Sequence, residues 1–160
     1  MASISTTARR CSASWIPDVL LADVNVLVYA HREDAPHHAG CRDWLETLIN
    51  GAQSFGYCDL VLSGFLRVVT HPKVFMRPSP LADALGFADQ LRNHPNGVAV
   101  TPGPRHWSIF RSLCVDAGTK GNLVADAYLA ALAIEAGCEW VTTDRDFSRF
   151  KGLRWRHPLQ

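Results

Sequence analysis

The sequence predicts an α/β fold built around a parallel sheet. Short apolar runs typical of buried strands alternate with longer segments in which apolar residues recur at helical spacing. The helical segments end at glycine or at a histidine–proline pair, both of which are common helix stop signals. With 160 residues, 48% of them hydrophobic, the chain is long enough for a single domain with its own core.

The expected elements follow in order along the chain. A buried strand at 18–24 passes directly into a helix at 25–30, and a second helix at 37–48 is stopped by Asn50-Gly51. The apolar stretch 60–70 is assigned as a buried helix, although it is also rich in β-forming residues. The remaining elements are a helix from 80 to 93, a strand at 97–101, helices at 105–117 and from 122 to 137, a strand at 139–143 and a short strand at 153–155.

The net charge, the cysteines and the first residues say less about function than the predicted fold does. A net charge of +1 neither requires nor excludes a nucleic-acid partner. No apolar run approaches the ~20 residues of a membrane span. Residues 1–17 are rich in Ser and Thr, lack the apolar segment of a secretory signal and are expected to form a mobile arm before a domain at 18–160. The five cysteines are odd in number and form no C-x-x-C pair, which argues against a zinc site or a disulfide framework and favours a reducing cytoplasm: Cys11, Cys41, Cys58, Cys114 and Cys138.

Three aspartates stand out because of their positions in these elements. Asp23 and Asp144 each end a predicted strand, and ligands of open parallel sheets bind at the carboxyl ends of strands. Asp126 lies in a helical stretch among apolar neighbours, where an unpaired carboxylate would be costly to bury. Carboxylates gathered at one point repel each other and imply a cation, and oxygen-only ligands favour Mg²⁺ or Mn²⁺. The sequence therefore predicts a metal site suited to phosphodiester hydrolysis.

Polar residues next to Asp144 include one alternative metal ligand and two possible hydrogen-bond donors. Asp146 is the alternative ligand: one of the two aspartates is expected to face the cluster while the other caps a short helix at 147–150. Asp144 is favoured for the metal because it follows the strand directly. Thr142 and Thr143 are expected either to donate hydrogen bonds to the carboxylates or to be ordinary β-forming residues.

Two asparagines accompany the other aspartates. Asn25 is the expected hydrogen-bond partner of Asp23, which could itself cap the helix that follows it while also binding metal. Asn122 lies four residues before Asp126 and shares its helix face. It either orients that carboxylate or caps the helix, and capping is the favoured interpretation.

Four stretches resemble, in order and spacing, the PIN-domain ribonucleases, and most closely the VapC-type toxins of type II toxin–antitoxin systems. The resemblance covers residues 18–157 and implies a PIN-like three-layer α/β/α sandwich with a short central parallel sheet of about four strands. The four stretches are Leu21-Ala22-Asp23-Val24-Asn25, Arg67-Val68-Val69-Thr70-His71-Pro72, 126–133 (DAYLAALA) and 142–150 (TTDRDFSRF).

The resemblance also implies an activity and its partners. Members of the family are Mg²⁺- or Mn²⁺-dependent endoribonucleases that cut structured RNA of the tRNA or rRNA class. They act in the cytoplasm as homodimers, without a membrane, and a cognate VapB-like antitoxin holds them inactive. The first, third and fourth acidic positions of the family site fall on Asp23, Asp126 and Asp144. Among the basic residues near the motifs, Arg67 and Arg145 are the candidate RNA contacts, with solvated surface as the alternative for each.

One position departs from the family pattern. The second acidic residue, normally a glutamate, is replaced by Gly64, and a glycine cannot bind metal or position a water. The alternative function is therefore a non-catalytic or weakly active PIN-like domain that binds RNA or an antitoxin. An aspartyl-phosphate phosphatase or receiver is disfavoured, because Asp23-Val24-Asn25 provides only D-x-N and no suitable lysine follows a late strand.

Overall fold

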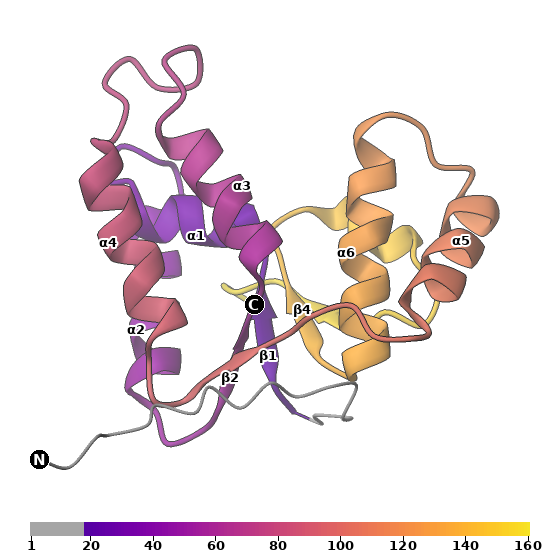
Figure 1. Ribbon diagram of the computed structural model, residues 1–160. Helices are drawn as coiled ribbons and strands as arrows, with labels where there is room; N and C mark the ends of the chain where they lie inside the picture. Colours follow the sequence, from indigo (N-terminus) through magenta and orange to yellow (C-terminus); the bar gives the residue numbers. More distant parts are fainter. Residues whose placement is uncertain (1–17) are drawn as a thin grey trace, which may run out of the picture.

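A five-stranded parallel sheet forms the centre of the computed structural model, which describes residues 18–160 (Figure 1). The strand order is β3-β2-β1-β4-β5, and every neighbouring pair is parallel. The arm expected at residues 1–17 lies outside the described residues. The strands are β1 (Leu20–Ala22), β2 (Phe55–Tyr57), β3 (Gly97–Ala99), β4 (Glu139–Val141) and β5 (Trp155–Arg156).

The register of the central strands brings distant parts of the sequence together. β1 lies in the middle of the sheet, and its last residue, Ala22, pairs with Val141 at the end of β4. The backbone N–H of Asp23 then donates to the carbonyl of Val141 at 2.9 Å. The segments that follow β1 and β4 therefore leave the sheet side by side, at its carboxyl edge, as the sequence predicts.

Helices cover both faces of the sheet and give the predicted three layers (Figure 1). Four helices gather on one side and two on the other. The expected helical assignment of 60–70 is confirmed, and α5 and α6 end at Gly118 and Gly137 in the left-handed conformation that favours glycine. The helices are α1 (Val24–His31), α2 (His38–Asn50), α3 (Asp59–Val69) and α4 (Leu81–Arg92) on the first side, and α5 (His106–Ala117) and α6 (Asn122–Ala136) on the second.

Two strands differ from the sequence prediction: β2 was not expected, and β5 is displaced. β2 has only three residues with glycine at its centre, which is a weak strand signal. Gly56 suits the close packing there, because a Cβ would stand 3.0 Å from Val100 Cγ2. β5 begins at Trp155, two residues later than expected, and the short helix near the end of the chain is a 3-10 helix, η1 (Arg145–Arg149), that begins before residue 147.

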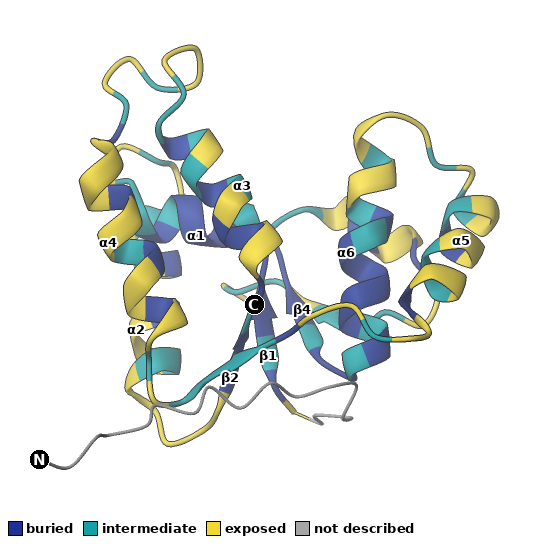
Figure 2. Cartoon of the chain, in the orientation of Figure 1, coloured by how far each residue is buried: buried dark blue, intermediate teal, exposed yellow. Residues whose placement is uncertain are grey.

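The core explains how α6 is held against the sheet (Figure 2). Ala127, Ala130, Ala131 and Ala133 are fully buried, and such small side chains let the helix approach closely. Asp126 immediately precedes this buried face, which places its backbone on α6. Within residues 18–160, no helix has the length and apolar character that crossing a bilayer requires. Cys41, Cys58, Cys114 and Cys138 are free thiols.

Candidate active site

Asp23 is the carboxylate of the predicted site that accepts the most hydrogen bonds among the described residues. It is 6% exposed and stands between β1 and α1, where its side chain caps the helix by accepting from the Val24 N–H at 2.6 Å. Its other oxygen, Oδ2, accepts from Asn25 Nδ2 at 3.0 Å and from the Thr142 hydroxyl at 2.7 Å. The expected pairing of Asn25 with Asp23 is therefore confirmed. A carboxylate offers about four lone-pair positions, so the three donors found among residues 18–160 leave one free.

Thr142 connects Asp23 with the segment that carries Asp144. Its side chain is fully buried, and its hydroxyl oxygen accepts from the Asp144 backbone N–H at 3.0 Å and from Asn25 Nδ2 at 3.2 Å while donating to Asp23. The side chain of the neighbouring Thr143 makes no hydrogen bond within the described chain; its backbone N–H donates to Asn25 Oδ1 at 3.3 Å. Of the two threonines considered from the sequence, the hydrogen-bonding role belongs to Thr142.

Asp144 takes the capping role for which Asp146 was the favoured residue. Its Oδ1 accepts from the Asp146 N–H at 2.8 Å and so caps η1, which makes the favoured assignment of the cap wrong. Its charge also raises the pKa of both Asp23 and Asp126. Asp146 is exposed and forms an ion pair with Arg149 at 3.3 Å, and its charge raises the pKa of Asp126 alone.

Asp126 reaches the same region from the opposite layer. It is half-buried near the start of α6, and no hydrogen bond to its carboxylate occurs among residues 18–160. Burial raises its pKa to about 6, with repulsion from Asp144 and Asp146 adding to the effect. Burial also raises the pKa of Asp23 to about 6; repulsion from Asp126 and Asp144 adds to this shift, while the hydrogen bonds from Thr142 and Val24 oppose it. The carboxylate charges are therefore close enough to raise one another's pKa, with Asp144 acting on both Asp23 and Asp126.

The carboxylates do not close around an ion on their own. Among the described residues, no three His, Cys, Asp or Glu side chains stand close enough to enclose a metal. Asn122, expected to cap α6, is instead the first residue of that helix; Gly121 occupies the cap position, and Asn122 is exposed without a side-chain hydrogen bond in the described part of the chain. The capping expectation is therefore wrong.

The remaining sequence candidates lie around the three carboxylates. Gly64 on α3 approaches α1 so closely that a Cβ would stand 2.9 Å from Val24 Cγ2, one residue from Asp23. Arg67, one helical turn further along α3, is exposed. Arg145 is exposed at the start of η1.

Comparison with known proteins identifies the family. The PIN domain family matches residues 20–153. Ribonuclease VapC43 of Mycobacterium tuberculosis is 49% identical over 141 residues, which cover 88% of this chain and 96% of that protein. Ribonuclease VapC25 of the same organism is 41% identical over 140 residues, or 88% of this chain and 99% of that protein.

Solved structures share the fold at low sequence identity. VapBC2 of Rickettsia felis, bound to a promoter DNA fragment, gives a TM-score of 0.63 at 17% identity, covering 87% of this chain and 98% of that one. VapC20 of Mycobacterium tuberculosis gives a TM-score of 0.59 at 15% identity, with coverage of 84% and 98%. Together with the identity to VapC43, these matches lead to one conclusion: the chain belongs to the PIN domain family, among the VapC ribonuclease toxins.

Proposed function

We propose that this chain is a metal-dependent endoribonuclease toxin that hydrolyses phosphodiester bonds of structured RNA. One observation carries the proposal: Thr142 joins Asp23 to the Asp144 backbone through hydrogen bonds, and the charge of Asp126 acts on Asp23 from the opposite layer. This arrangement belongs to a chain that is 49% identical to a ribonuclease, VapC43. Asp23, Asp126 and Asp144 are the proposed catalytic residues.

The donor chemistry of the site fits a hard divalent cation, Mg²⁺ or Mn²⁺. All three proposed ligands are carboxylates, and both Asp23 and Asp126 are destabilised in their charged form when no cation is present. No three acidic side chains enclose an ion among the described residues, so retained waters would complete its coordination beside these carboxylates. When bound, such an ion lowers the pKa of a water and stabilises charge on the scissile phosphate.

The protein's own groups supply order at this point. The Thr142 hydroxyl and the Asn25 amide fix the plane of the Asp23 carboxylate, leaving one lone-pair position of Asp23 for a ligand. Asp144 Oδ1 caps η1, while its Oδ2 accepts no hydrogen bond from residues 18–160. Asp126 has no hydrogen-bond donor among residues 18–160, so it is the carboxylate most able to accept a proton from an attacking water.

Substrate and partners follow from relatives and from the fold. VapC20, a neighbour in fold, is a Sarcin-Ricin loop cleaving toxin, and VapBC2 is a complex of toxin and antitoxin bound to promoter DNA. For this chain we therefore propose a structured RNA of the tRNA or rRNA class as substrate and a VapB-like antitoxin as partner. A homodimer acting in the cytoplasm, where such RNA occurs, completes the proposal.

Incubation of the purified chain with tRNA and with ribosomal RNA tests the activity. Discrete fragments should form with Mg²⁺ or Mn²⁺ and disappear with EDTA, and Asp126→Asn should produce none. Fragments formed equally by wild type and Asp126→Asn would point to a contaminating nuclease and leave the proposal without support. Light scattering of the same preparation measures the oligomeric state, and a single subunit would contradict the homodimer.

One observation favours the non-catalytic alternative. Gly64 presses against Val24 beside Asp23, at the position where the family pattern has its second acid. If RNA or an antitoxin binds the chain while no RNA is cut with any divalent metal, this alternative is correct and the nuclease assignment is wrong.

A further inference from the structure

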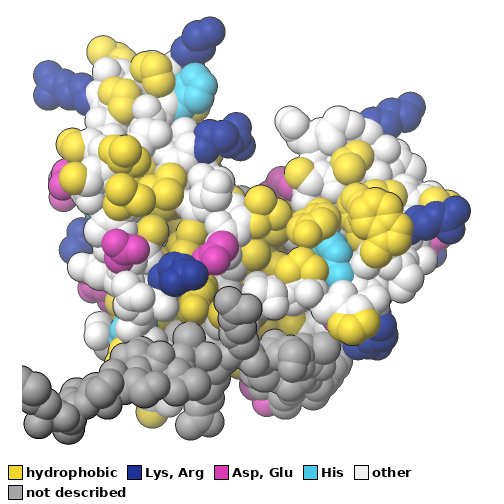
Figure 3. All heavy atoms as spheres, in the orientation of Figure 1, with side chains coloured by type: hydrophobic (Ala, Val, Ile, Leu, Met, Phe, Trp, Pro, Cys, Tyr) yellow, Lys and Arg dark blue, Asp and Glu magenta, His cyan; other side chains and the backbone are white. Residues whose placement is uncertain are grey.

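The end of the arm where α3 and α4 are joined carries unbalanced positive charge. Residues 60–82 include no Asp or Glu but contain Arg67, Lys73 and Arg77, here called the basic arm residues. All three are exposed. In the view of Figure 3, Lys and Arg side chains lie at the end of this arm, and no Asp or Glu side chain is visible at that end. Residues 60–82 therefore carry a local excess of positive charge, although the whole chain is nearly neutral.

The basic arm residues have no acidic partners among residues 18–160. The five ion pairs of the described residues involve other arginines, namely Arg32, Arg42, Arg92, Arg149 and Arg156. An unpaired cation can contact a phosphate without first breaking an ion pair. Neutralising phosphates with Lys and Arg also releases counterions, which is the main source of sequence-independent affinity for nucleic acid.

The loop that presents Lys73 and Arg77 is closed by its own backbone. The Ser79 N–H donates to the Val69 carbonyl at 2.8 Å, which joins the two ends of the loop between α3 and α4. Within it, the His71 carbonyl accepts from the N–H groups of Val74 at 3.0 Å and Phe75 at 3.2 Å. These bonds fold the loop into a fixed turn.

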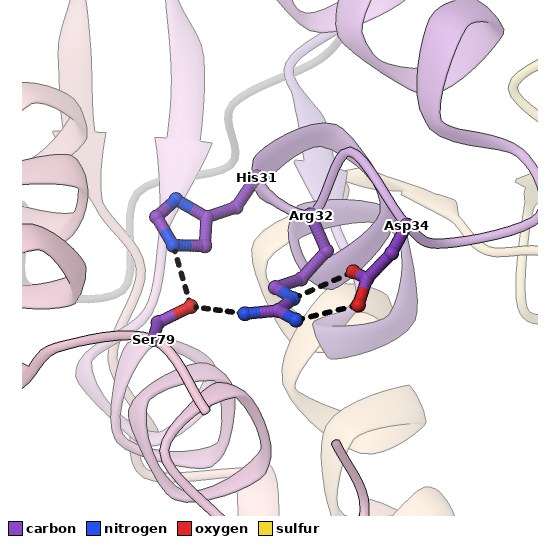
Figure 4. Close-up of polar contacts among 4 residues, drawn as sticks. All are labelled: His31, Arg32, Asp34 and Ser79. Carbon is purple, nitrogen blue, oxygen red and sulfur yellow. Dashed lines mark hydrogen bonds and ion pairs between the residues drawn. The ribbon is translucent and has the colours of Figure 1, made fainter. Parts of the chain in front are cut away.

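Side chains at the end of α1 and just after it hold this turn in place (Figure 4). The buried Ser79 hydroxyl lies 3.1 Å from His31 Nε2 and accepts from Arg32 at 3.0 Å. Arg32 also holds Asp34 through two hydrogen bonds, and its guanidinium carbon stands 4.2 Å from the ring centre of Phe75 in the loop. The anchored loop loses little conformational entropy when Lys73 and Arg77 bind a ligand.

α3 connects the candidate active site with this loop. Gly64 lies against Val24 beside Asp23, and Arg67 follows on the same helix face. From Gly64 to the end of the helix at Val69 the axis rises about 7.5 Å, at 1.5 Å per residue. A polyanion lying along α3 would therefore meet Arg67 first and the loop next.

We propose that Arg67, Lys73 and Arg77 form a binding surface for the RNA backbone, outside the acidic site and along α3. The proposal rests on the function proposed above, because it gives the polyanion its identity. The surface binds phosphates of the strand beyond the scissile bond, so it contributes affinity and direction without contacting the reacting atoms.

Binding of a fluorescein-labelled oligouridylate, measured by anisotropy in EDTA, tests this surface without any cleavage. The test variant is Lys73→Gln/Arg77→Gln. The matched control is Arg42→Gln/Arg92→Gln, which removes the same charge from two exposed arginines that have acidic partners elsewhere. The slope of log affinity against log salt should become shallower by about 1.4 for the test variant, since each phosphate contact to a single strand contributes about 0.7. The control should keep the wild-type slope.

Three results would overturn the proposal. Equal slopes in wild type and test variant would remove these residues from the interface. Equal losses in test and control variants would reduce the effect to net charge. If the test variant keeps its RNA affinity but loses binding to phosphatidylserine vesicles, the arm serves a membrane surface instead. Because EDTA prevents metal-dependent cleavage, a chain that shows the expected slope but cuts no RNA would refute the nuclease and leave this surface supported.

Discussion

The Thr142 hydroxyl donates a hydrogen bond of 2.7 Å to Asp23 Oδ2, across 119 positions of the sequence. The bond is possible because β1 and β4 are neighbours that end in register at Ala22 and Val141. The same oxygen accepts from the Asp144 N–H, so one buried hydroxyl holds two of the three proposed catalytic aspartates in a fixed relation. The register of β1 and β4 thus determines how Asp23 and Asp144 lie relative to each other in the candidate site.

Replacing Thr142 with valine should disrupt this relation while preserving shape. Thr142→Val removes the donor to Asp23 and leaves the Asp144 N–H without its acceptor, which should destabilise the protein by about 1–3 kcal/mol. RNA cleavage should fall strongly, because Asp23 loses the bond that fixes its carboxylate plane. Thr142→Ser keeps the hydroxyl and should retain most of the activity. Valine and serine variants with equal cleavage rates would show that the hydroxyl has no part in the reaction.

The fold was largely predictable because its signals are local. For example, α5 and α6 end at Gly118 and Gly137. Glycine after a helical segment is a stop signal that can be recognised in the sequence. β2 was not predictable, because its strand is made by pairing with β1 and β3 rather than by propensity. Gly56, which argues against a strand locally, allows the close packing of Val100, whose Cγ2 would stand 3.0 Å from a Cβ.

The places of the candidate carboxylates in the fold were predictable from the sequence, whereas the groups that hydrogen-bond to them were less so. Asp23 and Asp144 follow strands, which any reading of strand ends would find. Thr142 had a local signal as well, since a Thr side chain commonly accepts from the backbone N–H two residues later. Whether Asp144 or Asp146 capped η1 depended on where that helix began, and helix starts are poorly fixed by sequence.

Asp126→Asn should separate catalysis from stability. It removes one charge from the cluster without changing shape and breaks no hydrogen bond within the described chain, so cleavage should fall below detection while the metal-free protein becomes more stable. Each kcal/mol gained should raise the Tm by about 2–4 °C in a chain of this size. Asp23→Asn is the contrasting variant: an amide nitrogen would face the donors of Val24, Asn25 or Thr142, so it should not share the gain. A lower metal-free Tm for Asp126→Asn would mean that this carboxylate has a stabilising partner.

Acid should stabilise the metal-free protein through the same carboxylates. Asp23 and Asp126 have pKa values of about 6 when folded and an ordinary value of 3.8, so the folded state binds their protons more tightly than the unfolded state does. Their contribution to the free energy of unfolding is therefore least favourable above about pH 6, and it improves as the pH falls from about 7 toward about 4. Thermal melts of wild type and Asp126→Asn in EDTA isolate the contribution of Asp126, together with the part of the Asp23 pKa shift that the Asp126 charge causes.

The expected result is a Tm difference that favours Asp126→Asn at neutral pH and disappears in acid. Saturating Mg²⁺ should reverse the order of the two proteins at neutral pH, since only wild type gains the full charge attraction. A difference that stays constant with pH would show that Asp126 titrates normally in the folded protein.

Gly64 offers a direct test of the missing fourth acid. A side chain here gains about 1 kcal/mol of helix propensity, but its Cβ would stand 2.9 Å from Val24 Cγ2, and overpacking typically costs about 1–3 kcal/mol. Gly64→Ala should therefore be neutral to destabilising. Val24→Ala removes the obstructing methyl groups, so Val24→Ala/Gly64→Glu is the variant in which a glutamate can be accommodated beside Asp23.

That double variant should bind Mn²⁺ more tightly than Val24→Ala alone in a calorimetric titration, because an added carboxylate strengthens a site whose ligands are all oxygens. Val24→Ala/Gly64→Gln is the matched control: it fills the same space without the charge and should leave the affinity unchanged. Stability should rise only in the presence of metal, since without it the new charge adds to the repulsion on Asp23 and Asp126. Equal Mn²⁺ affinities for the Glu and Gln variants would show that position 64 faces away from the carboxylates, and the family's second acidic position would then have to be sought elsewhere on α3.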